Sequence, residues 1–175
     1  MRKKILIIVL GFLSLFIIAY TVPMFPRQGN KYTKKTEDRA IKKITQNKKL
    51  ECSGIGWEGK TNDLEKIQVL FRTEEFFDVE KARKYIIYCA KIYLEEFNSD
   101  ESVRSYFRNY PLNIFNLKIS ISSDNTYSEV NLIKLINGII FYENLKIPID
   151  ESIDLHEETY EEALEKLNSK DKNNG

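Results

Sequence analysis

The longest amphipathic pattern in the chain runs from Asp78 to Phe97. Apolar side chains recur there at helical spacing and cover more than a narrow stripe, and Asp78 stands where a helix N-cap is expected. A helix with so broad an apolar face needs an extended surface, such as a sheet, against it. The pattern therefore predicts a central helix around which a small α+β domain folds.

Alternation of apolar and polar positions, which is typical of half-buried strands, marks most of the expected sheet. The expected strands are 65–73, 115–122, 130–136 and 139–143. The last two flank Asn137-Gly138, a dipeptide typical of a type I′ hairpin turn. Shorter helical patterns cover 37–50, 101–109 and 157–167. The expected order is α-β-α-α-β-β-β-α, with an antiparallel sheet curved around the central helix as in cystatin-like folds.

The amino terminus is a basic cluster, MRKK, followed by the unbroken apolar run Ile5–Val22. The run is long for a signal-peptide core of about 7–15 residues and near the lower limit for a membrane span. Both a single-pass signal anchor and a cleaved signal peptide fit this pattern, and we prefer the anchor. The lipid bilayer is then a partner of Ile5–Val22, and the rest of the chain is exported, at the cell membrane or secreted. We expect a polar stem over 23–36, a globular domain over 37–167 and a disordered tail over 168–175.

Charge is divided along the chain. Residues 1–60 carry 13 Lys/Arg against 4 Asp/Glu, which leaves 14 against 22 in residues 61–175. Because nucleic-acid binding needs a cationic face to contact phosphates, no nucleic-acid partner is expected for the acidic domain.

Residues 52–61, CSGIGWEGKT, contain a phosphate-loop pattern. Gly54 and Gly59-Lys60-Thr61 have the Walker A spacing, and the same stretch matches the dinucleotide fingerprint. Such a loop needs a buried strand before it and a helix after it. Here a polar segment precedes the pattern and a predicted strand follows. We interpret the stretch as a glycine-rich turn with Trp57 at the edge of the core, and expect no cofactor; a nucleotide-binding enzyme using Gly54–Thr61 is an alternative.

His156 is the only histidine, in the segment HEETYEE. A zinc protease would need a second histidine four positions later, where Tyr160 stands. The surrounding glutamates are most simply a solvated helix face, so no catalytic residue and no metal site are expected. A hydrolase that uses His156 and neighbouring glutamates is the second enzymatic alternative.

Cys52 and Cys89 are the only cysteines. In an oxidising compartment they could form one disulfide joining the glycine-rich stretch to the central helix, which would contribute about 3–4 kcal/mol. The alternative is two separate thiols, because Cys89 lies on the apolar face of the predicted helix.

Several short segments in the globular part are similar to those of a family of small exported proteins of intracellular bacteria, for which no activity is established. These segments are Gly56-Trp57, Ala82-Arg83, Tyr93-Leu94-Glu95-Glu96, Val103-Arg104-Ser105-Tyr106, Asn109-Tyr110-Pro111 and Glu158-Thr159-Tyr160-Glu161-Glu162-Ala163. The resemblance implies a shared fold and export, and it implies no activity.

Together these patterns predict a membrane-anchored or secreted α+β domain that binds another protein, or has a structural role, at the cell envelope.

Overall fold

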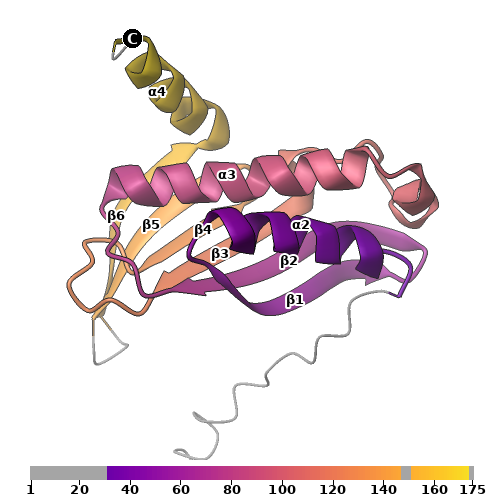
Figure 1. Cartoon of the computed structure of the whole chain (residues 1–175), viewed down its shortest axis with the longest axis horizontal. Coiled ribbons are helices and arrows are strands. Elements are labelled where there is room, and N and C mark those ends of the chain that lie inside the picture. The colour runs from indigo at the N-terminus through magenta and orange to yellow at the C-terminus, as the bar shows by residue number, and fades with distance from the viewer. Residues whose placement is uncertain (1–30, 147–150, 174–175) are drawn as a thin grey trace, which may run out of the picture.

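Two long helices lie side by side on one face of a six-stranded sheet (Figure 1). This computed structural model describes residues 31–146 and 151–173. The predicted anchor Ile5–Val22 and most of the predicted stem lie outside the described residues. None of the helices in the described ranges is long and apolar enough to cross a bilayer.

Consecutive strands form a mainly antiparallel sheet, and the helices lie before, between and after these runs of strands, which confirms the predicted α+β class. In chain order they are α2 (Lys34–Asn47), β1 (Glu51–Lys60), β2 (Asp63–Thr73), α3 (Val79–Asn98), the 3-10 helices η1 (Glu101–Tyr106) and η2 (Ile114–Asn116), β3 (Leu117–Ser123), β4 (Leu132–Ile136), β5 (Ile139–Lys146), β6 (Glu151–Thr159) and α4 (Tyr160–Asn173).

The strands lie in the sheet in the order in which they occur in the chain. Neighbouring strands are antiparallel except β2 and β3, which run parallel and are joined by the crossover helix α3. A parallel pair needs such a crossover, because a tight turn can join only antiparallel strands. The sheet is therefore mixed, and the prediction of a wholly antiparallel sheet was wrong.

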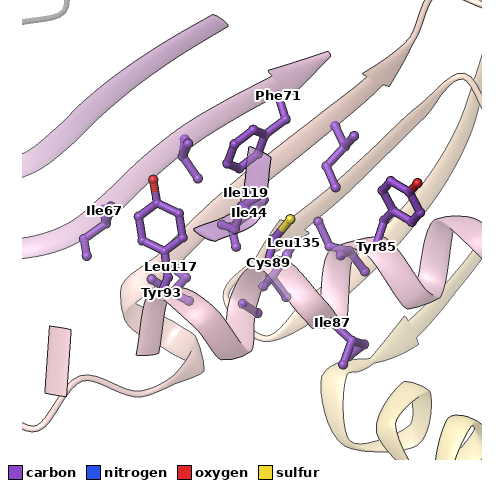
Figure 2. Close-up of a cluster of buried hydrophobic side chains, with 14 of the residues drawn as sticks. Ile44, Ile67, Phe71, Tyr85, Ile87, Cys89, Tyr93, Leu117, Ile119 and Leu135 are labelled. Carbon is purple, nitrogen blue, oxygen red and sulfur yellow. The ribbon is translucent and has the colours of Figure 1, made fainter. Parts of the chain in front are cut away.

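The central helix is confirmed as α3. The Asp78 side chain accepts a hydrogen bond from the backbone N–H of Lys81 (2.7 Å), which caps the first turn. The predicted apolar positions of α3 lie on the sheet and are buried: Ala82, Ile86, Cys89, Tyr93 and Phe97. Figure 2 shows part of this core, where Cys89 and Tyr93 of α3 lie among Ile67, Phe71 and Ile119 of the sheet and Ile44 of α2.

The hairpin at Asn137-Gly138 is also confirmed. These residues have φ angles of 51° and 77° and join β4 to β5. Positive φ at both positions is what a type I′ turn requires.

Two strands were not predicted, because neither has the expected alternation. The glycine-rich stretch is the edge strand β1 rather than a turn, and it pairs with β2 along its whole length. The segment before the predicted helix 157–167, together with the first residues of that helix, is the other edge strand, β6, paired with β5. An edge strand with many polar or glycine residues does not show the period that marks a half-buried strand.

Three boundaries also differ from those expected. Helix α2 begins at Lys34, within the predicted stem, and its N-cap residue is Thr33. Thr36, the last residue of the predicted stem, lies inside the helix, and its hydroxyl donates to Asp100 (2.5 Å). Residues 101–106 form a 3-10 helix where an α-helix was predicted, and α4 continues to Asn173, into the predicted tail.

Candidate functional site

The first candidate site is the buried carboxylate of Glu158, which lies beside His156, the only histidine. The Glu158 side chain is 1% exposed and belongs to β6. Glu158 lies opposite Ile140 of β5, on the face of the sheet that the helices cover. Side chains from α3, β5 and α4 converge on it, so four elements meet at one carboxylate.

Each oxygen of Glu158 accepts hydrogen bonds. Arg83 Nε of α3 donates to Oε1 (2.6 Å), and the Tyr142 hydroxyl of β5 donates to the same oxygen. Lys166 Nζ of α4 donates to Oε2 (2.7 Å). The Arg83 guanidinium also lies over the Tyr142 ring, 5.9 Å from its centroid. We call these four residues the Glu158 cluster.

Burial by itself would raise the pKa of Glu158, but the hydrogen bonds from Arg83, Lys166 and Tyr142 outweigh it and lower the pKa to about 2. Burial, followed by the bond to Glu158, raises the pKa of the Tyr142 hydroxyl. Glu158 is therefore ionised and Tyr142 protonated at neutral pH. A carboxylate with so low a pKa is a weak general base, because efficient proton transfer needs a pKa near the working pH. The cluster is suited to joining α3, β5, β6 and α4.

His156 lies beside this cluster, on the same face of the sheet. Its ring stacks on Tyr142 with centroids 5.6 Å apart, and its Nε2 is 3.8 Å from Glu158 Oε2. The side chain is 42% exposed, at an open groove of about 440 Å³ between β6 and α4. The prediction that His156 stands at a helix start beside a solvated glutamate face was wrong, because residues 151–159 form a strand and Glu158 is buried.

One glutamate of α4 at that groove, Glu162, has a structural role of its own. The Glu162 carboxylate accepts from the backbone N–H of Thr159 (2.8 Å), and the Thr159 hydroxyl accepts from the N–H of Glu162 (3.2 Å). This reciprocal pair is a capping box at the start of α4.

The phosphate-loop pattern is divided between a strand and a hairpin turn. Gly54, Gly59 and Lys60 belong to β1, and Thr61 begins the turn to β2. A strand follows the turn, so no helix N-terminus meets these residues, and the geometry that cradles a phosphate is absent at this site. Glu58, inside the pattern, pairs with Lys118 of β3.

Cys52 and Cys89 are buried thiols in the structure and are not joined by the disulfide considered above. The Cys52 sulfur donates to the carbonyl oxygen of Gly54 at 3.8 Å. Burial raises the pKa of the Cys89 thiol, so this sulfur is a poor nucleophile at neutral pH. Among residues 31–146 and 151–173, no group of three or more His, Cys, Asp or Glu side chains is arranged to hold a metal ion.

The second candidate site is the face of the sheet that α2 and α3 do not cover. Its side chains alternate with the buried ones, and strand register groups them into three rows. The rows are Gly54, Leu70, Ser120, Lys134, Phe141 and Glu157; Gly56, Gln68, Lys118, Ile136, Ile139 and Thr159; and Arg72, Ser122, Leu132, Glu143 and Asp154. We call this surface the open face.

The cations at the open face are bonded to neighbours on or beside it. Lys118 pairs with Glu58, and Lys134 Nζ lies 2.5 Å from Glu143 Oε1. Lys66 donates to Asn137 Oδ1 (2.6 Å), and Arg72 donates to Asp124 (2.9 Å).

Besides Leu70 and Leu132, the apolar side chains of the open face gather near the turn of the β4–β5 hairpin. Ile136 lies directly opposite Ile139, whose side chain is 39% exposed, and Phe141 follows two residues later on the same strand. Phe115, also exposed, contacts the turn at Gly138, where an added Cβ would come within 3.0 Å of its ring. We call Phe115, Ile136, Ile139 and Phe141 the hairpin patch.

Arg83 is the site residue that the sequence pattern did not reveal. It lies between Ala82 and Lys84 in the predicted helix, and a cation is ordinarily expected on the exposed side of such a helix. Its partner Glu158 belongs to a strand that was not predicted, so no acceptor for a buried arginine was evident. The hairpin patch had a partial signal, because the hairpin itself was predicted.

No family model, no curated protein and no solved structure matches this chain. The resemblance to exported proteins of intracellular bacteria stays a prediction, and the functional argument rests on the residues themselves.

Proposed function

We propose that this chain is a membrane-anchored module of the cell envelope that binds another protein through the open face of its sheet. The apolar run Ile5–Val22 supports the anchor, because it is uninterrupted by charge and follows a basic cluster. The observation that carries the binding role is the hairpin patch, a set of apolar side chains on a sheet face that no described helix covers.

The chemistry of the open face favours an apolar protein surface as its partner. The cations there are bonded to acceptors on or beside the same surface, so little unpaired positive charge remains to bind an anionic ligand. The apolar side chains of the hairpin patch are what an association would remove from water, at about 25 cal/mol per Å² of area buried. Aromatic residues such as Phe141 are enriched in the centres of protein interfaces.

The two enzymatic alternatives have less support. Glu158 is already bonded through both oxygens and has a low pKa, which disfavours it as a proton-transfer group. The phosphate-loop pattern lacks the helix that such a loop needs. A cystatin-like arrangement, a long helix laid across a curved sheet, is the finer architectural proposal, although here a second helix lies beside it and the sheet includes a parallel pair.

Site-specific photocrosslinking in the full chain tests the binding role. A benzophenone amino acid in place of Phe141 should yield one discrete protein adduct in cells. The same amino acid in place of Tyr127, a loop residue that is 87% exposed, should not yield that adduct. Ile139→Asp should reduce the adduct several-fold, and the matched Tyr127→Asp should leave it unchanged. Equal adducts at both positions, or none at position 141, would refute the proposed surface.

A further inference from the structure

Helix α2 has one buried face and one strongly basic exposed face. Its buried residues are Thr36, Glu37, Ala40 and Ile44. On the outer side a shallow open depression of about 490 Å³ is lined by Lys31, Lys34, Lys35, Asp38, Arg39 and Lys42. Asp38 is the single acidic residue among them. We call these six residues the basic face.

The cations of the basic face differ in whether they already form ion pairs within the domain. Arg39 is bonded to two carboxylates of the helix layer, Glu96 (3.0 Å) and Asp100 (2.7 Å). Lys34 lies 3.4 Å from Asp38, and both side chains are more than half exposed, so this pair is weak. Lys35 and Lys42 are exposed, lie two helical turns apart on one side of α2, and form no ion pair within the described residues.

We propose that the basic face of α2 lies on anionic lipid headgroups of the membrane in which the chain is anchored. This inference rests on the anchor of the proposed function. Only 11 residues separate Val22 from Lys34, so α2 stays within about 40 Å of the point where the apolar run ends. A tether of this length gives the basic face a high effective concentration at the bilayer, and even a weak surface affinity is then sufficient.

Charge complementarity favours lipid as the occupant. A lysine near an anionic membrane surface contributes about 1 kcal/mol, and the attraction fades beyond a Debye length of about 10 Å in 0.1 M salt. The rest of the domain is acidic, with 14 Lys/Arg against 22 Asp/Glu in residues 61–175. An anionic surface therefore repels most of the domain and attracts the basic face, which selects one orientation.

That orientation fits the proposed binding surface. Helix α2 lies in the helix layer, and the open face is on the other side of the sheet (Figure 1). With α2 on the lipid, the hairpin patch points away from the bilayer and is available to a protein partner.

The test uses the full chain reconstituted in vesicles of phosphatidylcholine, with or without phosphatidylglycerol. Trp57 is the only tryptophan, so energy transfer from it to dansyl-labelled headgroups reports how close the domain lies to the surface. We expect more transfer with phosphatidylglycerol present, and loss of that gain in high salt. Lys35→Gln/Lys42→Gln should lower the docking equilibrium constant about 25-fold, at about fivefold for each lysine.

A matched control removes two cations from the opposite side of the sheet. Lys66→Gln/Arg72→Gln should leave the gain in transfer unchanged. Resistance to alkaline extraction is measured on the same vesicles. A chain that alkali removes overturns the anchor and the inference together. A chain that stays in the vesicles, but shows equal transfer with both lipids or an equal loss in both double variants, overturns the docking of α2 alone.

Discussion

The carboxyl group of Glu37 should make the stability of the domain fall as the pH rises toward neutrality. Glu37 lies on the buried side of α2 and is 1% exposed, and its Oε1 has no hydrogen-bond partner among the described residues. Burial, followed by the charge of Asp38, raises its pKa from 4.5 to about 7, although Lys34 acts in the opposite direction. From α3 it is faced by the buried hydroxyl of Tyr93, whose own pKa is raised chiefly by burial.

The sign follows from proton linkage. Between pH 4.5 and about 7 the folded state keeps the proton of Glu37 while the unfolded state has lost it. Stability is therefore complete below pH 4.5, declines as the pH rises through about 7, and is then constant. A displacement from 4.5 to about 7, at about 1.4 kcal/mol for each unit of pKa, corresponds to a decline of about 3 kcal/mol.

Glu37→Gln isolates this effect, because glutamine has nearly the shape of the protonated carboxyl and does not titrate. We expect the decline between pH 5 and pH 8 to disappear in this variant. The extra amide donors of glutamine can cost about 1–3 kcal/mol when buried without partners, but equally at both pH values, so the decline is the quantity to compare. The carboxyls of Glu75, Glu96 and Glu158 have lowered pKa values, so their effect on the pH dependence of stability falls mainly below pH 5.

The assay is urea unfolding of residues 31–175 at pH 5 and pH 8, followed by the fluorescence of Trp57. This fragment contains the whole described core, from Ala40 to Ala163. Glu129→Gln, a change at an exposed loop residue, is the matched control and should keep the wild-type decline. The same decline in wild type and in Glu37→Gln would refute the assignment to Glu37.

Three further predictions concern other parts of the fold. Arg83→Met should lower the free energy of unfolding in urea by about 3–5 kcal/mol, because it removes the main partner of a buried carboxylate. The double variant Arg83→Met/Glu158→Leu should lose clearly less than the sum of the two single changes, and additive losses would contradict the coupling of the two residues. Cys89 should resist thiol-specific labelling at pH 8 until the fragment is unfolded, and rapid labelling of the folded protein would contradict its burial. Gly59→Ala should lower the free energy of unfolding, measured by thermal unfolding, by about 2 kcal/mol, because the φ of Gly59 is 108° and a Cβ there would come within 2.4 Å of a backbone oxygen. Gly56→Ala meets only ordinary contacts and should be nearly neutral. Equal effects of the two changes would refute the role of φ.

Local periodicity was sufficient to predict the amphipathic elements, in which buried and exposed positions recur at the period of a helix or a strand. Helix α3 and strand β3 have one dry side and one wet side, so their patterns matched the structure closely. The Asn137-Gly138 hairpin was predictable because its turn needs positive φ, which few residue types supply.

The edge strands were beyond this kind of reasoning. Strand β1 has glycines on its open side, at Gly54 and Gly56, and β6 is acidic and largely exposed, so pairing with a neighbouring strand defines them more than their own pattern does. The Glu158 cluster depends on β6 and was missed for that reason. The parallel pairing of β2 with β3 is likewise a property of how α3 crosses the sheet, and no short segment encodes it.

The contacts between α2 and α3 determine whether docking of one helix can orient the whole domain. Arg39 and Lys43 of α2 share the Glu96 carboxylate of α3, and Arg39 also bonds Asp100 just beyond the end of that helix. These bonds lie at the rim of an apolar contact that buries Ala40 and Ile44. A helix held by both its buried side and its rim moves with the sheet as one body, so a force applied at Lys35 and Lys42 turns the open face as well. Loss of the Glu96 contacts should therefore loosen the orientation of the domain on the membrane without removing the lysines that bind the lipid.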